Sequence, residues 1–188
     1  TWSHGANSSS AENLLAGTYK IIVTDYYNCS VEQEYILTQP SLLTSSVSKI
    51  TNVDCKNEAT GSIQINVSGG VPSYDFEWLH GAISQNVENL LAGDYSVIIT
   101  DKNNCTTTSV ASIIEPQQLQ ATIEVSKPIS CYKGSDGELF ANITGGAPPY
   151  SITWYNPRNK LYSDVAVLSQ VFEGVYQLEV YDSHNCYK

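Results

Sequence analysis

The sequence lacks methionine altogether and is poor in charged side chains, which make up 15% of its 188 residues. An average soluble domain has about 25%. Basic residues are the scarcest, since 9 Lys and Arg stand against 19 Asp and Glu and give a net charge of −10. A phosphate backbone would repel such a chain, so we expect no nucleic-acid partner. The sequence also has no run of about 18 apolar residues, which excludes a transmembrane helix.

No charged segment followed by an apolar stretch opens the sequence, so no signal peptide is visible. The residues that replace the missing charges are Ser, Thr, Asn, Val, Ile and 13 tyrosines. This is the composition of β-sheet.

A repeat of 76 residues organises the sequence. Residues 2–29 align without a gap on residues 78–105, with 17 of 28 positions identical. The tryptophans recur at the same step: Trp2, Trp78 and Trp154. The third copy carries five additional residues between Trp154 and Gly174, whose position and role the sequence leaves open.

The phase of the repeat predicts three parts. We expect residues 1–40 to be the C-terminal part of a truncated repeat, residues 41–116 to be a complete repeat, and residues 117–188 to be a repeat that lacks its last strand. On this interpretation the sequence is a piece of a longer array. Its proline-marked joints, around Pro40 and Pro116, predict an extended and stiff arrangement.

Apolar residues alternate with polar ones in several short segments, which is typical of half-buried antiparallel strands. We predict an all-β chain of tandem small antiparallel β-sandwiches, immunoglobulin-like or fibronectin-like. Three tyrosines near the start of a late strand should return their hydroxyl groups to an upstream backbone group. The predicted core consists of Trp2, Trp78, Trp154, Tyr19, Tyr95, Tyr176, Ile63, Ile65, Val67, Val97 and Ile99.

Taken together, the Gly-Gly-Val-Pro turn at 69–72, Leu90-Leu91-Ala92-Gly93-Asp94-Tyr95 and the Asp101…Asn104-Cys105 turn resemble the SprB-type repeat. That repeat occurs in many copies in giant surface adhesins of gliding Bacteroidetes. The resemblance implies a β-sandwich repeat, export by the type IX secretion route, and a place in a long filament at the cell surface. It implies no catalytic residues.

Nothing in the sequence predicts an enzyme. His4 and His80 share a repeat position that Asn156 occupies in the third copy, and His184 lies in a turn, so we interpret all three as exposed turn residues. The aspartates that open the Asn-Cys turns are weak calcium candidates: Asp25, Asp101 and Asp182. We favour the alternative that each carboxylate caps its own turn, and we expect no cofactor.

The five cysteines allow two pairings that respect the period. Within units, Cys55 would join Cys105 and Cys131 would join Cys186, which leaves Cys29 unpaired. Across units, Cys29 would join Cys55 and Cys105 would join Cys131. We favour the first, because an up-and-down unit with one strand between Trp78 and Gly93 brings Cys55 and Cys105 to the same end. Five reduced thiols are the third alternative.

Two functions remain open. The first is a structural segment of a long, stiff adhesin filament that serves gliding and surface attachment, held by neighbouring repeats and by carrier proteins at the outer membrane. The second is a repeat that itself binds surface polysaccharide or protein. Tyrosines outside the inward alternation could stack on sugars in that case: Tyr26, Tyr27, Tyr155 and Tyr181. Both hypotheses place the protein outside the cell.

Overall fold

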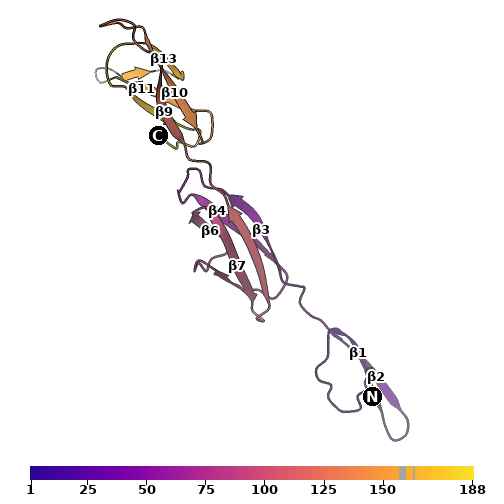
Figure 1. Cartoon of the computed structure of the whole chain (residues 1–188). Helices are drawn as coiled ribbons and strands as arrows, with labels where there is room; N and C mark the ends of the chain where they lie inside the picture. Colours follow the sequence, from indigo (N-terminus) through magenta and orange to yellow (C-terminus); the bar gives the residue numbers. More distant parts are fainter. Residues whose placement is uncertain (157–159, 163) are drawn as a thin grey trace.

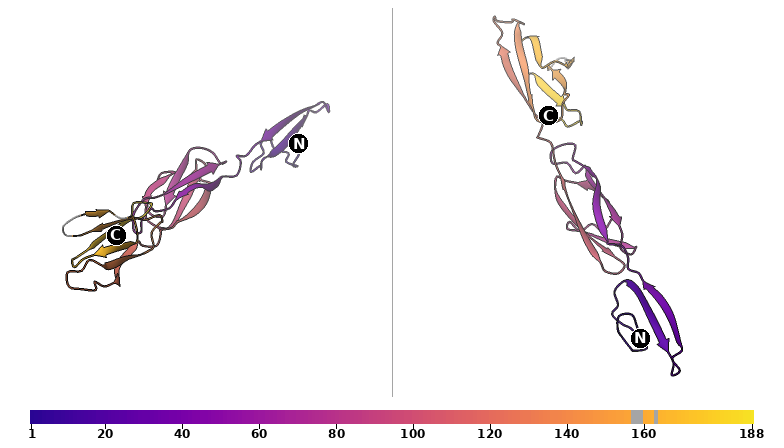
Figure 2. Two further views of the ribbon diagram at one scale, coloured as in Figure 1. Left: turned by 90° about the horizontal axis from the view of Figure 1, so that it is seen from above. Right: turned by 90° about the vertical axis from the view of Figure 1, so that its right-hand side faces the viewer.

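The structure, a computed structural model, describes residues 1–156, 160–162 and 164–188. The described residues form only strands, turns and loops, in three parts that follow one another along an extended line (Figures 1 and 2). We call residues 1–40 the first segment, residues 41–116 the central repeat and residues 117–188 the third repeat. Within the described ranges there is no helix long and apolar enough to cross a membrane.

The central repeat is a sandwich of two antiparallel three-stranded sheets. One sheet has the order β3-β4-β6 and the other has the order β5-β7-β8. The strand bounds are β3 Thr44–Thr51, β4 Gly61–Ser68, β5 Tyr74–Trp78, β6 Val87–Leu90, β7 Gly93–Asp101 and β8 Thr106–Ile113. The all-β fold of small antiparallel sandwiches predicted from the alternating pattern is therefore confirmed.

Burial follows the alternation along each strand, because successive side chains of a strand point to opposite faces. In β4, Ile63 and Ile65 are buried while Gln64 and Asn66 are exposed. Of the predicted core residues, the buried ones are Ile63, Ile65, Trp78, Val97, Ile99 and Trp154. Val67, Tyr95 and Tyr176 are partly buried and pack against these clusters, and Trp2 and Tyr19 are half-buried.

Three tyrosine hydroxyl groups close turns in the predicted way. Tyr19, Tyr95 and Tyr176 each donate to the carbonyl oxygen four residues upstream, over 3.0, 2.9 and 3.1 Å. The indole N–H of Trp78 likewise donates to the Ser84 carbonyl oxygen over 2.8 Å, and Trp2 makes the equivalent bond to Ser8 over 3.0 Å. The same local contacts therefore recur at the repeat spacing.

Strand direction decides which loops meet at each end of the central repeat. β5 runs antiparallel to β7, with Tyr74 opposite Asp101. β4 runs antiparallel to both of its partners, so β6 ends where β4 begins, with Leu90 opposite Gly61. The loop between β3 and β4, which carries Cys55, therefore lies at one end. The turn between β7 and β8, which carries Cys105, lies at the other.

The first segment contains a β-hairpin, β1 Gly17–Thr24 and β2 Ser30–Leu37, which corresponds to β7 and β8. An isolated bridge joins Trp2 to Ile21, at the position of the Trp78–Val97 pair. No second sheet covers this hairpin among the described residues, and every residue of β2 is exposed.

The third repeat has sheets of order β13-β10-β9 and β12-β11-β14. Its strands are β9 Gln120–Lys127, β10 Gly137–Thr144, β11 Ser151–Tyr155, β12 Lys160–Tyr162, β13 Val167–Val171 and β14 Gln177–Tyr181. The additional β12 pairs with β11, in the stretch that contains the five inserted residues; positions 157–159 and 163 of that stretch lie outside the described residues. The C-terminus returns to the end that faces the central repeat (Figure 1).

Candidate functional site at the joint between repeats

One aspartate organises the end of the repeat at which the Gly-Gly turn meets the turn after β7, and we call this end the base of the repeat. Asp101 is buried at the end of β7, where its Oδ1 accepts hydrogen bonds from the backbone N–H groups of Asn103 and Cys105 over 2.8 and 2.9 Å. Its Oδ2 accepts a third from the Val71 N–H over 2.8 Å. The carboxylate therefore closes its own turn and also ties that turn to the Gly-Gly turn, residues 69–72.

These donors favour the ionised carboxylate. The Val71 N–H, together with those of Cys105 and Asn103, holds the pKa of Asp101 below its usual value of 3.8, although desolvation acts in the opposite direction. For Asp182, desolvation raises the pKa, but the N–H groups of Ala147, Cys186 and His184 outweigh it and the pKa is again lowered.

All three calcium candidates accept the same two hydrogen bonds within their own turns. Asp25 accepts from the N–H groups of Tyr27 and Cys29 over 2.8 Å each, and Asp182 accepts from Ala147, His184 and Cys186. Each aspartate therefore caps its own turn, the interpretation that the sequence favoured. In the described part of the chain, no group of three or more His, Cys, Asp or Glu side chains lies close enough to hold a metal ion.

The Gly-Gly turn requires glycine for space as well as for backbone conformation. A Cβ atom on Gly69 would lie 2.0 Å from the Leu42 carbonyl oxygen, and one on Gly70 would lie 2.7 Å from the Asp101 Oδ2. Both residues have positive φ, 75° and 62°. The entering chain is held at the same point, since the Gly70 N–H donates to the Ser41 carbonyl oxygen over 2.8 Å.

A disulfide joins the central repeat to the third repeat. Cys55 lies in the loop at residues 52–60 of the central repeat, and Cys186 ends the Asp182 turn at the base of the third; their Cα atoms are 5.6 Å apart across 131 residues of sequence. His184 Nδ1 lies 3.3 Å from the Asp54 carbonyl oxygen at the same contact. A pocket of about 520 Å³ here is lined from both repeats, for example by Lys56 and Leu119.

The linker between these repeats is anchored as it leaves β8. Glu115 forms an ion pair with Lys56 over 3.5 Å and accepts a hydrogen bond from the Asn57 N–H over 3.0 Å. The Ile114 N–H donates to the Asn52 side chain over 3.1 Å. The Cys55 loop therefore holds the start of the linker and the base of the next repeat together.

Neither predicted cysteine pairing is correct. Cys55 does not bond to Cys105, nor Cys131 to Cys186; Cys29, Cys105 and Cys131 are free and exposed. The prediction assumed that β6 runs opposite to β5. Instead, residues 79–86 carry the chain back to the end of the sandwich at which β5 began, so β6 runs in the same direction as β5. Cys55 and Cys105 therefore lie at opposite ends of the sandwich. The eight residues of β8 alone span roughly 26 Å, whereas a disulfide needs Cα atoms within about 7 Å.

The other candidate residues lie away from this joint. His80 is exposed and packs between two aromatic rings, 5.7 Å from Trp78 and 5.2 Å from Tyr95 between ring centroids. His4 lies in the same way beside Trp2 and Tyr19.

Two exposed surfaces fit the binding hypothesis. Tyr26 and Tyr27 are exposed at the tip of the first hairpin, where their rings meet edge to face at 5.5 Å. A shallow groove of about 590 Å³ runs along the outer face of β5 and β7, with Glu77, Ile83 and Ile98 in its lining. No sequence signal pointed to this groove, because it is made by two strands that are not adjacent in the chain.

Comparison with known proteins identifies the repeats. The SprB repeat family matches residues 47–83 and residues 123–159, two stretches that start 76 residues apart. The chain carries SprB repeats. Each match runs from the first strand of a repeat through its tryptophan, and so includes the Gly-Gly turn. No catalytic family is evident among the matches, and no curated protein matches the chain.

One similar solved structure is the crystal structure of Down Syndrome Cell Adhesion Molecule (DSCAM) isoform 1.30.30, N-terminal eight Ig domains. The alignment covers 92% of this chain at 13% identity with a TM-score of 0.42. The chain spans about a quarter of the length of the DSCAM fragment, since the alignment covers 26% of it.

Proposed function

We propose that this SprB-repeat chain is a structural segment of a stiff cell-surface adhesin filament, with a role in gliding and surface attachment and no catalytic activity of its own. The observation that carries the proposal is the joint between the central and third repeats. There, a short proline-containing linker and the Cys55–Cys186 bridge connect the two repeats end to end. Two covalent connections oppose bending at a joint more strongly than one.

The strand lengths support a spacer role. A strand of eight residues spans roughly 26 Å, so each repeat with its joint adds on the order of 30–40 Å of reach. In repeat arrays of this kind each unit mainly contacts its neighbours, and length increases in proportion to copy number. The partners we propose are therefore adjoining repeats and a carrier protein at the outer membrane.

The disulfide and the SprB repeats support a location outside the cytoplasm. Disulfides persist in oxidising compartments and are rare in the cytosol. We propose export by the type IX route and display at the cell surface.

Labelling of intact cells that make the protein tests this proposal. An antibody raised against the whole chain should label the outer surface, and the labelled sites should move along the cell during gliding. A strain that lacks the repeats should glide or attach poorly. Labelling that requires permeabilised cells would contradict the proposal.

The groove on the outer face of β5 and β7 favours a second candidate, a repeat that itself binds polysaccharide or protein. Ile83 and Ile98 are 81% and 45% exposed there beside Glu77. A glycan array and a pull-down with the complete chain separate the two functions. Saturable micromolar binding would favour the binding role if Ile98→Ser abolishes it and Val110→Ser leaves it intact, since Val110 is exposed on β8 outside the groove.

A further inference from the structure

The free thiol of Cys105 lies in a turn with the same geometry as the bonded Cys186. In both turns the cysteine N–H donates to the aspartate Oδ1, over 2.9 Å at Asp101 and 3.0 Å at Asp182. The residue before the cysteine has positive φ in both, 62° at Asn104 and 63° at Asn185. Cys105 is therefore presented at the base of the central repeat as Cys186 is presented at the base of the third.

The free thiol of Cys131 occupies the position of the bonded Cys55. The loop at residues 128–136 joins the first two strands of the third repeat, as the loop at residues 52–60 does in the central repeat. Cys131 accepts a hydrogen bond at its carbonyl oxygen from the Gly134 N–H over 2.8 Å, and Cys55 accepts the equivalent bond from Glu58 over 3.2 Å. Lys133 and Asn57, two residues after the cysteines, both have positive φ.

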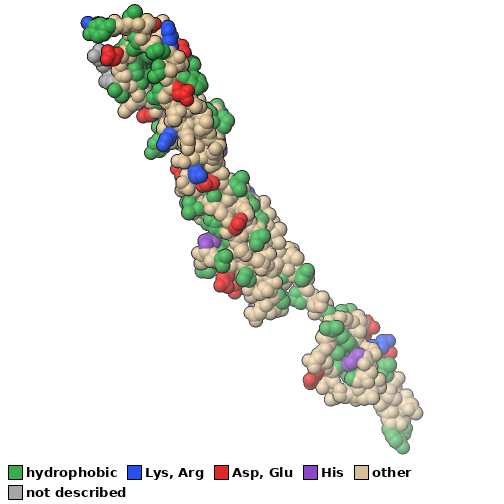
Figure 3. Space-filling view, in the orientation of Figure 1, with side chains coloured by type: hydrophobic (Ala, Val, Ile, Leu, Met, Phe, Trp, Pro, Cys, Tyr) green, Lys and Arg blue, Asp and Glu red, His purple; other side chains and the backbone are tan. Residues whose placement is uncertain are grey.

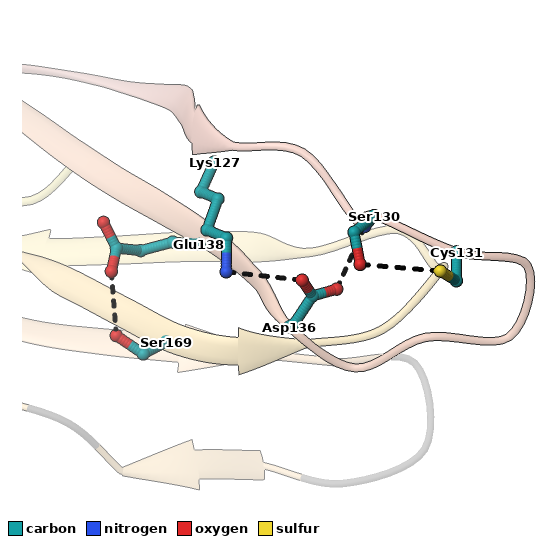
Figure 4. Close-up of polar contacts among 6 residues, drawn as sticks. All are labelled: Lys127, Ser130, Cys131, Asp136, Glu138 and Ser169. Carbon is teal, nitrogen blue, oxygen red and sulfur yellow. Dashed lines mark hydrogen bonds and ion pairs between the residues drawn. The ribbon is translucent and has the colours of Figure 1, made fainter.

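In both loops, the residue before the cysteine also donates a hydrogen bond to the side chain of the residue that ends the loop. Asp136 accepts a hydrogen bond from the Ser130 N–H over 3.0 Å (Figure 4). At the same position in the central repeat, Thr60 accepts one from the Asp54 N–H over 2.9 Å. The N–H and hydroxyl groups of Ser130, with Lys127 at 3.3 Å, lower the pKa of Asp136 to about 2. Asp136 is therefore ionised at neutral pH, and it holds the Cys131 loop in shape without a bonded cysteine.

We propose that Cys105 and Cys131 are each one half of an inter-repeat disulfide, in the same register as Cys55–Cys186. In this register the cysteine of the first loop in one repeat bonds to the cysteine of the aspartate turn in the next repeat. Cys29, in the equivalent Asp25 turn, is a third such half. An array of these repeats then carries one disulfide at every joint. The partner of Cys105 would lie in the first loop of the repeat to which the first segment belongs, and those of Cys29 and Cys131 in neighbouring repeats, so none of the three has its partner among residues 1–188.

The register can be stated as a spacing. Cys55 and Cys186 are 131 residues apart, and that interval contains the five inserted residues of the third repeat. Two successive repeats without the insertion would place bonded cysteines 126 residues apart. Every disulfide of such an array would join two successive repeats, whereas the disulfides of many small secreted domains lie within one domain.

The chemistry is thiol oxidation. Two Sγ–H groups lose two protons and two electrons as the Sγ–Sγ bond forms, and a disulfide oxidant accepts them and becomes two thiols. Oxidised glutathione supplies this step in the experiment below.

The first segment, which the structure describes in full, contains only the β1–β2 hairpin, so it has no strands whose connecting loop could carry a partner for Cys105. The central and third repeats, which share a disulfide, run into one another, whereas a thin neck connects the first segment to the central repeat, where Cys105 has no partner (Figure 3). The proposal concerns covalent structure only, so its test does not depend on the role of the array in adhesion.

A chain with one additional repeat tests the register. A second copy of residues 41–116, marked by Ile50→Val at a partly exposed strand position, is inserted after residue 116 of the complete chain. The protein is refolded in reduced and oxidised glutathione, alkylated and digested with trypsin without reduction. We expect Cys55 of the first copy to be linked to Cys105 of the second, and the marked Cys55 to be linked to Cys186.

The remaining cysteines provide the internal control, since Cys29, Cys131 and the first-copy Cys105 should be alkylated. Cys105→Ser in the second copy should free the first-copy Cys55 and leave the bond to Cys186 intact. A Cys55–Cys105 bond within one copy would overturn the proposal. So would a folded chain, checked by near-UV circular dichroism, in which the bond to Cys186 forms while the new joint stays reduced.

Discussion

Replacement of Trp78 by alanine should remove a large share of the stability of the central repeat. Trp78 is 2% exposed and belongs to the core cluster that also contains Ile63, Ile65 and Val97. Truncation of a buried aromatic side chain costs about 3–5 kcal/mol. A unit of this size has roughly 4–11 kcal/mol in total, at about 0.05–0.15 kcal/mol per residue.

A milder change separates the two contributions of the indole. Trp78→Phe keeps most of the apolar volume but removes the N–H that donates to the Ser84 carbonyl oxygen over 2.8 Å. A hydrogen bond of this kind contributes about 0.5–1.5 kcal/mol net to stability. We therefore expect Phe to lie between tryptophan and alanine in stability.

Hydrogen exchange followed by mass spectrometry is the suitable measurement, because a chain of several units does not unfold in one two-state step. The free energy of opening should fall in peptides from β4 and β7, while peptides from β10 in the third repeat provide the reference. Leu79→Ala is the matched control, since Leu79 is 88% exposed next to Trp78 and should change stability by less than about 0.5 kcal/mol. A loss below about 1 kcal/mol for Trp78→Ala would refute the assignment of Trp78 as the centre of the core.

Three further predictions concern the base of the repeat and its boundaries. Folding lowers the pKa of Asp101, so the stability that its ionised carboxylate contributes is complete above pH 3.8 and is lost as the pH falls through the lower folded value. In urea melts over this pH range, Asp101→Asn should lose less stability on acidification than the unchanged chain, and an equal loss would contradict the prediction. Gly70→Ala should lower the melting temperature more than Gly81→Ala, since both glycines have positive φ but a Cβ meets a carboxylate oxygen at 2.7 Å only at Gly70 and nothing within 4 Å at Gly81; equal shifts would argue against the close contact. Residues 41–116 alone should give the near-UV circular dichroism of a folded domain and residues 1–40 should not, because the hairpin of the first segment has no covering sheet; a folded 1–40 fragment would place the repeat boundary elsewhere.

Much of the fold could be predicted from the sequence because its causes are local. Strand alternation has a period of two, so the spacing of Ile63, Ile65 and Trp78 already assigned them to a buried face. The tyrosine hydroxyl bonds span only four residues, and the turn at Asp101 closes within five. Recurrence of these short patterns at 76 residues then identified the repeat.

Contacts at the base of the repeat were only partly visible in the sequence. The recurrence of Gly-Gly and of Asp101 at a fixed phase indicated that each had a role, but nothing in the sequence joined them. The Val71–Asp101 hydrogen bond brings together residues 30 apart in the chain, from two different turns. That contact exists only because β5 and β7 pair with Tyr74 opposite Asp101.

The cysteine partners were decided by the tertiary structure alone. Cysteine spacing is compatible with several pairings, and the choice among them depends on which loops meet at each end of the sandwich. That in turn depends on the direction of β6, which residues 79–86 set by crossing from one sheet to the other without any periodic pattern. A disulfide needs two Cα atoms within about 7 Å, a condition on distance in space that Cys55 and Cys186 meet across 131 residues and two repeats.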